Sequence, residues 1–457
     1  MTDMPAAFEG TGNAAKSRRE RIRTGLARRH QGEMLFRGLG LAAIVLALGF
    51  VAIFFWTILS KGVPSFMQPV LHLEVAFDPA VITDPVPPVQ AAGQSDADFR
   101  AARLKWQRDL AGLNWNKIVE AALRGVMPAG TEIDSRQILS IVETSERHRL
   151  REMFVADPSL LGRSVKVDLL ASANVDNWLK GNIDRSLPDA QQQLSAPARA
   201  VADALAANGT ISMNFAWSIF TNVDSRAAPA AAGLAGAFMG SVYMMLVVIL
   251  LAVPIGVASA IYLEEYAPKS RLTDLIEVNI NNLAAVPSIV FGLLGAAVFI
   301  NTLHLPLSAP LVGGLVLTLM TLPTIIIATR GALQGVSPSL RQAALGLGAS
   351  KTQMVFHHVL PVTFPSILTA TIIGVAQALG ETAPLLLIGM NAFVASVPAT
   401  PLDQATALPV QVFLWQGNEN RNFFEARTSA AIMVLLGLMI LLNAVAIFLR
   451  TRLERRA

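Results

Sequence analysis

The 457-residue chain contains no cysteine, and only 15% of its residues are charged. The absence of cysteine excludes disulfide bonds, thiolate catalysis and cysteine-based metal sites. The six histidines are scattered without H-E-x-x-H or another ligand spacing, so we expect no metal site. The sequence also lacks a nucleophile motif and a G-x-x-x-x-G-K-[ST] loop that would cradle a nucleotide phosphate. We therefore predict a chain that has no catalytic residues, binds no cofactor itself and is not an enzyme.

Apolar residues, by contrast, are abundant. Hydrophobic residues make up 53% of the chain, and the mean hydropathy is +0.50. This composition is typical of an integral membrane protein rather than of a soluble enzyme. The net charge of +4 would suggest a nucleic-acid partner for a soluble domain. Here the basic residues cluster beside apolar runs, where membrane topology explains them, so we expect membrane lipid and no nucleic acid as a partner.

Six apolar runs are long enough to cross a bilayer, which takes about 20 residues. We place the spans at 38–60, 233–262, 280–301, 310–330, 362–390 and 428–450. The last five belong to a membrane core over 230–450, in whose first span Gly236 and Gly240 have the spacing that lets helices approach closely. Before the first span, residues 1–37 form a basic tail that we expect to be disordered.

Positive charges set the orientation of these spans, because cytoplasmic loops carry an excess of lysine and arginine. The tails 1–37 and 451–457 are basic, and the connection between the fourth and fifth spans carries Arg341 and Lys351. The loop 301–309 has neither lysine nor arginine. We therefore expect a multi-pass protein with both termini and this connection in the cytoplasm.

Residues 61–229 differ in character, since they are mixed and charged and contain no spanning run. We expect an extracytoplasmic domain there, with amphipathic helices at 96–124 and 135–154 and strands at 164–170 and 211–220. No catalytic motif lies in it, so the sequence assigns it no activity. The predicted fold class is an all-α polytopic membrane protein with six transmembrane helices and a long extracytoplasmic mixed α/β domain between spans 1 and 2.

The stretch 337–361 interrupts the apolar sequence with arginine, lysine and histidine but no acidic residue. Local rules predict two short helices in it. Ser337 is a suitable N-cap followed by proline at the first helical position, and Gly346 or Gly348 can end that first helix.

The second of these helices opens with Ser350 and Gln353, which have the spacing of a capping box, and we expect Pro361 to close it. A membrane protein that folds such a helical elbow in a basic cytosolic loop presents it to a cytosolic partner. We call residues 337–361 the elbow.

The span 362–390 contains an ionisable residue, Glu381, between Gln377 and Pro384. A carboxylate inside an apolar span costs several kcal/mol unless it is paired, protonated or in contact with water, and such residues are functional by default. We expect Glu381, with Gln377 and Thr382, either to act in gating or to pair with a partner helix. Alternatively, Glu381 makes a structural hydrogen bond that closes a kink before Pro384, and the sequence favours neither interpretation.

The elbow resembles the E-A-A loop of ABC importer permeases. The matching positions are Gln342-Ala343-Ala344, Gly348, His357 and Leu360-Pro361. Gln342 stands where the family usually has Glu, and His358 where it usually has Ile. The resemblance implies coupling helices that dock into a cleft of the ATP-hydrolysing subunit. The implied coupling residues are Arg341, Gln342, Ala343, Ala344, Gly348, Leu360 and Pro361.

Three further stretches, at 282–295, 380–385 and 408–412, resemble the PstA-type permeases of phosphate-specific ABC importers. The likeness covers roughly residue 215 to the end, and the first span with 61–229 resembles an amino-terminal extension of some members. It implies a type I ABC importer permease core in the bacterial inner membrane that forms half of a phosphate pathway. The implied partners are a sister permease subunit, a dimer of ATP-binding subunits that hold ATP and Mg²⁺, and a periplasmic phosphate-binding protein. The family often has Arg where this chain has Gln377, which leaves a phosphate-attracting charge to the sister subunit.

Other functions stay open. A permease for another oxyanion, such as sulfate, molybdate or tungstate, would share the loop. A secondary transporter should show broken-helix repeats and several intramembrane ionisable residues, of which Glu381 is the only clear case. A membrane-anchored signalling or scaffold protein would explain the domain at 61–229, but it would not need the elbow.

Overall fold

The computed structural model describes residues 10–83, 86–128, 131, 133–392 and 394–454. The chain divides into two units, Met1–Ser60 and Lys61–Ala457. Helix α1 (Gly10–Gly62) makes up the described part of the first unit. The expectation of a disordered tail is therefore wrong from residue 10 onward. Alanine, arginine and glutamate favour helix, and a helix that extends from an apolar span needs no new nucleus.

The accessory domain, residues 61–229, is built around an antiparallel sheet of order β2-β1-β3. The strands are β1 (Met67–Ala76), β2 (Ser164–Leu170) and β3 (Ile211–Phe215). Strand β2 has the predicted bounds, whereas β3 ends five residues earlier than predicted. Strand β1 was not predicted, although it is central. Its buried residues are continuous from Gln68 to Leu71 and alternate with exposed residues only from Leu71 to Ala76, and it contains Pro69, a residue that is rare in central strands.

Helices cover one face of this sheet, on which Leu71, Leu73 and Val75 of β1 are at most 1% exposed. The two predicted amphipathic helices are each split in two, by turns at 112–114 and 140–145. The helical segments of this domain are η1 (Val63–Phe66), α2 (Asp96–Ala111), α3 (Trp115–Val126), α4 (Ser135–Leu139), α5 (Glu146–Ala156), η2 (Pro158–Leu160), α6 (Ala173–Lys180), η3 (Asp189–Gln191), α7 (Ala196–Ala207), α8 (Ser218–Thr221) and η4 (Pro229–Ala231). The predicted mixed α/β character of residues 61–229 therefore matches the described elements.

The membrane core follows the accessory domain. Its helical segments are α9 (Ala235–Ile261), η5 (Tyr262–Tyr266), α10 (Arg271–Ala284), α11 (Ser288–Gly295), η6 (Ala296–Thr302), α12 (Pro310–Gln334), α13 (Pro338–Gly346), α14 (Lys351–Met354), η7 (Val355–Val359), α15 (Leu360–Gly380), α16 (Ala383–Leu387), α17 (Leu408–Gln416) and α18 (Arg421–Glu454). Within the described residues, five helices are long and apolar enough to cross a membrane, or six if the bent pair of α10 and α11 counts as one span. The chain is thus a polytopic helical protein.

Two predicted spans are not the straight helices that we expected. The span 280–301 is broken after α10, and α11 leaves the break at an angle of 101°. Pro287, which cannot donate a backbone hydrogen bond and restricts the residue before it, stands in this break. The prediction of one continuous span over 362–390 is also wrong in its second half, since α15 ends at Gly380 and a separate short helix, α16, follows.

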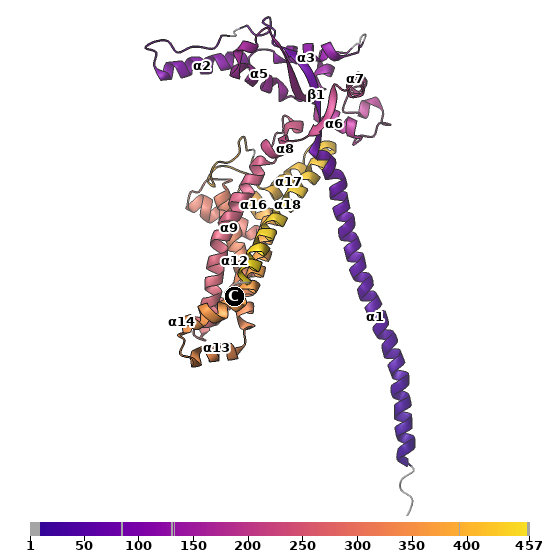
Figure 1. Ribbon diagram of the computed structural model, residues 1–457, viewed down its shortest axis with the longest axis vertical. Helices are drawn as coiled ribbons and strands as arrows, with labels where there is room; N and C mark the ends of the chain where they lie inside the picture. The colour runs from indigo at the N-terminus through magenta and orange to yellow at the C-terminus, as the bar shows by residue number, and fades with distance from the viewer. Residues whose placement is uncertain (1–9, 84–85, 129–130, 132, 393, 455–457) are drawn as a thin grey trace, which may run out of the picture. The chain divides into compact units, whose positions relative to one another are not determined.

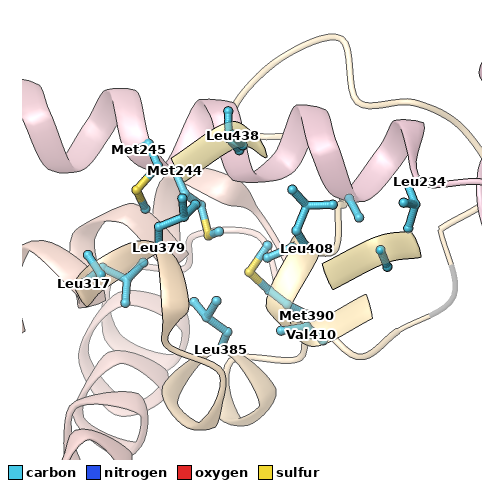
Figure 2. Packing of buried hydrophobic residues seen from close by; sticks show 14 of the residues in the cluster. Leu234, Met244, Met245, Leu317, Leu379, Leu385, Met390, Leu408, Val410 and Leu438 are labelled. Carbon is cyan, nitrogen blue, oxygen red and sulfur yellow. The ribbon is translucent and has the colours of Figure 1, made fainter. Parts of the chain in front are cut away.

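Glycines allow the spanning helices to pack closely. A Cβ atom at Gly256 of α9 would lie 2.8 Å from the Ile325 side chain of α12, and the two helices run side by side (Figure 1). The predicted close approach at Gly240 is made to a loop and not to a helix, because a Cβ there would lie 2.1 Å from the carbonyl oxygen of Thr406. Figure 2 shows the apolar cluster that these helices share, including Met244 and Leu317.

The accessory domain is held to the core by a buried arginine of α18. Arg427 is 2% exposed, and its Nη2 donates to the carbonyl oxygen of Ala230 at 3.0 Å and to Oε1 of Gln68 at 3.3 Å. The backbone N–H of Ala230 in turn donates to Oε2 of Glu143 at 2.9 Å. These contacts join β1, the loop before α9 and the first turns of α18.

Candidate functional site

The first half of the elbow is a capped helix, as the local rules predict. Helix α13 begins after Ser337, whose Oγ accepts a hydrogen bond from the backbone of Ser339 at 3.3 Å. It ends at Gly346, and Gly348 then takes a left-handed conformation with φ of 89°. The N–H of Ala349 donates to the carbonyl oxygen five residues back at 3.1 Å, which is the closure of a Schellman motif.

The second half of the elbow is the end of a spanning helix. Ser350 and Gln353 form the predicted capping box, with reciprocal bonds of 3.2 Å and 2.9 Å. The expectation that Pro361 closes this helix is wrong, because the helix continues from Lys351 to Gly380. A π-helical turn at Val355–Val359 precedes the proline. Such a turn changes the hydrogen-bond register, so the ring of Pro361 need not meet the carbonyl four residues earlier.

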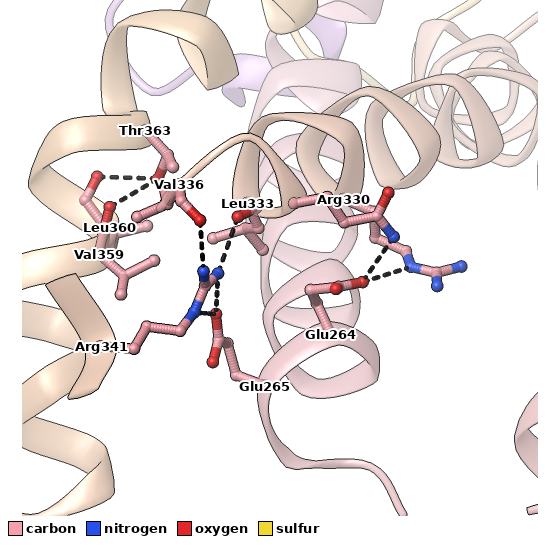
Figure 3. A network of polar contacts seen from close by, with 10 residues as sticks. Glu264, Glu265, Arg330, Leu333, Val336, Arg341, Val359, Leu360 and Thr363 are labelled. Atoms are coloured by element: carbon pink, nitrogen blue, oxygen red, sulfur yellow. Dashed lines mark hydrogen bonds and ion pairs between the residues drawn. The ribbon is translucent and has the colours of Figure 1, made fainter. Parts of the chain in front are cut away.

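Arg341 fastens α13 to the ends of two spanning helices (Figure 3). Its Nε and Nη2 donate to Oε1 of Glu265, at 3.1 Å and 2.8 Å, just after α9. Its Nη1 donates to the carbonyl oxygen of Val336 and its Nη2 to that of Leu333, at 2.7 Å and 2.8 Å, where α12 ends. A cation is favourable at a helix carboxyl terminus, where carbonyl groups lack partners. Arg341 therefore points inward and is not free to bind a partner protein.

A second arginine neutralises the acidic residues beside the elbow. Nη2 of Arg330 in α12 lies 2.6 Å from Oε1 of Glu277, and its Nε lies 3.5 Å from Oε2 of Glu264. Gln334 also donates to Glu264, at 2.9 Å. Glu264 and Glu277 thus pair with Arg330, which lies outside the elbow, and Glu265 pairs with Arg341. Only the Glu265 pair lowers the net positive charge of the elbow itself.

The predicted coupling residues fall into two groups. Ala344 is 5% exposed and packs with Ile261 and Val355 beneath the elbow, while Leu360 and Pro361 are half-buried. The other predicted residues of α13 and its turn are exposed: Gln342, Ala343 and Gly348.

Sequence reasoning missed two exposed leucines at the tip of the elbow. Leu345 is 47% exposed and Leu347 is 91% exposed. Successive helix residues are about 100° apart, so a helix that partly buries Leu340 and fully buries Ala344 turns Leu345 outward. That periodicity could have identified Leu345. The tip therefore combines a fixed base with an apolar, outward surface that suits a partner protein.

Gly348 offers a test of this turn. A Cβ atom at Gly348 would meet nothing within 4 Å, so the requirement for glycine comes from its positive φ. We expect Gly348→Ala to destabilise the elbow by about 1 kcal/mol, the cost of left-handed backbone for an L-residue. Gly346→Ala is the matched control, since Gly346 also has open space but no positive φ. Hydrogen–deuterium exchange of residues 338–354 should rise in Gly348→Ala only. Equal exchange in both variants would contradict the inference that the positive φ of residue 348 requires glycine.

The two broken spans meet at their second halves. A Cβ atom at Gly292 of α11 would lie 2.7 Å from Cα of Pro384 in α16. Two of the stretches that the sequence singled out, 282–295 and 380–385, are therefore in direct contact. Glycine is needed at 292 because the backbone of the other short helix takes the space of a side chain.

Glu381 lies in the break between α15 and α16, with ψ of 132°. It is half-buried, as is Thr382, whereas Gln377 is exposed on α15. The kink that we expected before Pro384 is present. Within the part of the chain that the structure describes, the side chain of Glu381 makes no hydrogen bond or ion pair that would close it. Gln377 thus lies in the last turn of α15, and Glu381 and Thr382 lie in the break that follows it.

An apolar groove of about 460 Å³ is lined by α9, η5, the end of the elbow and α15. Its lining includes Val257, Phe356, Phe364 and Leu368, and its polar groups are the two tyrosines 262 and 266 and Thr371. A lining with so few hydrogen-bond donors and no cation does not suit a multiply charged anion. The lining of the groove therefore offers no cation and few hydrogen-bond donors to an oxyanion.

Three polar residues of the accessory domain have the order of a hydrolase triad. Nδ1 of His72 lies 2.6 Å from Oδ1 of Asp168, and its Nε2 lies 2.7 Å from Oγ of Ser212. They stand on neighbouring strands on the open face of the sheet, where the Asp168 side chain is 62% exposed. Water competes there with His72 for hydrogen bonds to the carboxylate of Asp168. We therefore interpret Asp168, His72 and Ser212 as a cross-strand polar ladder and not as a catalytic triad.

Two family models and several known proteins are similar to parts of the chain. A family model described as "Binding-protein-dependent transport system inner membrane component" matches residues 252–457, and one described as "Domain of unknown function (DUF3333)" matches residues 23–189. A solved structure titled "Inward facing conformations of the MetNI methionine ABC transporter" aligns with 48% of this chain and 94% of its own, at 18% identity and a TM-score of 0.37.

Curated relatives each match less than half of the chain. It is 33% identical to the "Probable ABC transporter permease protein YqgI" of Bacillus subtilis, over 39% of this chain and 60% of that protein. It is 33% identical to the "Phosphate transport system permease protein PstA" of Yersinia pestis, over 43% of this chain and 65% of that protein. The chain thus spans less than two thirds of the length of these two relatives.

A PstA protein of Xylella fastidiosa (strain Temecula1) is matched more fully, at 30% identity over 237 residues, 48% of this chain and 76% of that protein. With the transport-component match and the apolar helices, this indicates a multi-pass inner membrane protein. The chain therefore belongs to the PstA-type permeases, within the binding-protein-dependent inner membrane components of ABC transport systems.

Proposed function

We propose that the chain is the permease subunit of an ATP-driven importer of inorganic phosphate and that it forms half of the translocation pathway beside a sister permease. The observation that carries this proposal is the elbow, which presents an outward apolar tip on a base fixed to the spanning helices. The printed names of the PstA relatives support phosphate as the substrate. The chain binds no cofactor in this proposal, and ATP is hydrolysed with Mg²⁺ in a dimer of partner subunits.

The elbow transmits the motion of the ATPase dimer. Helix α13 is tied by Arg341 to the ends of α9 and α12, and α14 is the beginning of the helix that becomes α15. A displacement of the tip therefore moves three spanning helices as a rigid body. The central pathway then opens alternately to the two sides of the membrane, and a periplasmic binding protein delivers phosphate from outside.

The orientation follows from the positive-inside rule, with both termini and the elbow in the cytoplasm. The two ends of α9 support this arrangement. Its first residue is bonded to the accessory domain, from the N–H of Ala235 to the carbonyl of Asn222 at 3.0 Å, and its last turn leads to Glu265 at the elbow. The accessory domain and the elbow therefore lie at opposite ends of a spanning helix (Figure 1), which supports the proposal that the domain lies outside the cytoplasm.

Glu381 has a gating role in this proposal. An ionised carboxylate repels phosphate, so Glu381 acts by controlling the break between α15 and α16 and not by coordinating the anion. We expect Glu381→Gln, which keeps the shape of the side chain, to lower phosphate uptake about tenfold, an effect of about 1.4 kcal/mol on the barrier. Thr371→Val, in α15 and in the lining of the apolar groove, should leave uptake unchanged. Uptake that is equal in both variants at equal expression would exclude the gating role.

The proposed function is tested by reconstituting the chain with its ATPase and sister subunits in vesicles that contain phosphate-binding protein. We expect uptake of radiolabelled phosphate that requires ATP and is not reduced by excess sulfate, molybdate or tungstate. Competition by one of these anions would favour the alternative oxyanion permease. Uptake without the ATPase would indicate a secondary transporter, and failure of any ATPase chain to co-purify would favour a scaffold protein.

A further inference from the structure

The apolar face of the accessory sheet continues beyond the helices that cover it. Leu71 and Ile211 are paired across β1 and β3, and they are 0% and 6% exposed. Met67 and Phe215 are paired four residues further along and lie on the same face, because side chains alternate along a strand. They are 38% and 42% exposed. The uncovered end of the sheet is the one at which the chain arrives from the first span.

An ordered group of aromatic rings extends this uncovered face. Phe66 stacks on Phe215 and on Phe220, with centroid distances of 6.4 Å and 5.9 Å and interplanar angles of 8° and 10°. Trp217 meets Phe215 edge-on at 4.9 Å. Trp217 is 67% exposed and Phe220 is 44% exposed. We call these four residues the aromatic patch.

The patch accounts for the exposed aromatic surface of the accessory domain. Among the described residues of 61–229, every strongly exposed phenylalanine or tryptophan belongs to it, namely Phe215, Trp217 and Phe220. Other exposed apolar residues, such as Val89 and Leu104, stand elsewhere in the sequence and in other elements. A single exposed apolar residue needs no explanation, but a group of rings held in fixed stacks marks a surface that something covers.

The first membrane span ends beside this patch, and the next spanning helix, α9, begins beside it. Phe66 is the last residue of the first candidate span, and its carbonyl oxygen accepts a hydrogen bond from the N–H of Ala216 at 2.7 Å. Helix α8, which carries Phe220, is bonded to the residue that precedes α9, from the N–H of Leu234 to the carbonyl of Ile219 at 2.7 Å. The contact is tight, since a Cβ atom at Gly233 would lie 2.3 Å from the carbonyl oxygen of Ser218. The rings are therefore fixed at the level where the first span ends and α9 begins.

We propose that the aromatic patch lies in the lipid–water interface of the leaflet in which the first span ends, so that the accessory domain rests on the bilayer. Tryptophan and other aromatic side chains favour this layer, because their apolar rings meet the acyl chains while polar groups stay hydrated. Lipid covers Met67 and the rings where protein helices do not. This contact is independent of the transported substrate and of the elbow.

Because the chain has no cysteine, single cysteines can be introduced and spin-labelled. The full chain is placed in nanodiscs of phosphatidylcholine and phosphatidylglycerol, and the label's access to oxygen and to a water-soluble nickel chelate is measured. We expect the oxygen-to-nickel ratio to be several-fold higher for Trp217→Cys and Phe220→Cys than for Leu104→Cys. Leu104 is the matched control because it is 58% exposed on α2 of the same domain.

Two results would overturn the proposal. A ratio at 217 and 220 equal to that at 104 would place the patch in water. Low access to both reagents would mean that protein covers it, either another copy of the chain or a partner subunit. Two labelled positions are used so that a folding defect in one variant, detected by gel filtration, leaves the other to decide.

Discussion

Replacing Arg341 by methionine is expected to abolish ATP-coupled uptake and to lower the melting temperature of the purified chain. The side chain of Glu265 is 6% exposed, and its Oε1 accepts two hydrogen bonds from Arg341. Without the guanidinium a nearly buried carboxylate has no countercharge, which costs about 3–5 kcal/mol. The carbonyl groups of Leu333 and Val336 lose a donor as well. The base of α13 would then no longer hold to α9 and α12.

Two further variants separate stability from coupling. The double variant Arg341→Met with Glu265→Met removes both charges and should recover most of the lost stability. Its uptake should stay low if the elbow must be tied to α9. Lys351→Met is the single-site control on the same elbow, because Lys351 is exposed and only approaches the Tyr266 ring, at 5.4 Å. If the Arg341 variant melted at as high a temperature as the Lys351 variant, Arg341 would not be the residue that holds α13 to α9 and α12.

The elbow was predictable in outline because its signals are local. Ser337, Gly346 and the pair of Ser350 and Gln353 act on backbone groups within a few residues of themselves, so their effect does not depend on the rest of the fold. The same holds for strand β2, whose alternation gave its bounds. The apolar spans were found for a similar reason, because length and hydropathy within one segment are enough.

The incorrect or missing predictions concern features that depend on residues far away in the sequence. Pro361 closes a helix by local rules, but in this fold a π-helical turn precedes it and the spanning helix continues. Arg341 looks like part of a basic surface until Glu265, 76 residues earlier in the chain, is placed beside it. Gly292 was part of a recognised stretch, yet its partner Pro384 could not be identified from the sequence alone.

Replacing Arg427 by methionine is expected to loosen the accessory domain from the core. Arg427 is 2% exposed and lies near Glu143 and Asp176, which are 5% and 5% exposed. Removing the cation leaves these carboxylates with less compensating charge, at a cost of about 3–5 kcal/mol. The melting temperature should fall and proteolysis within 61–229 should accelerate. Arg421→Met is the matched control, since Arg421 is exposed in the first turn of the same helix.

The pH dependence of this loss distinguishes a charge effect from a packing effect. Burial raises the pKa of Glu143 and of Asp176 above their ordinary values, and the charge of Arg427 opposes that rise. In the variant both pKa values should rise further. A carboxyl group whose pKa is raised by folding favours the folded state below its unfolded pKa, and this contribution is lost as the pH rises through the folded value. The melting-temperature deficit of Arg427→Met should therefore be larger at about pH 8 than at about pH 5. An equal deficit at both would mean that Arg427 stabilises the junction through its hydrogen bonds to Ala230 and Gln68 and its contact with the Phe423 ring, and not by compensating the charges of Glu143 and Asp176.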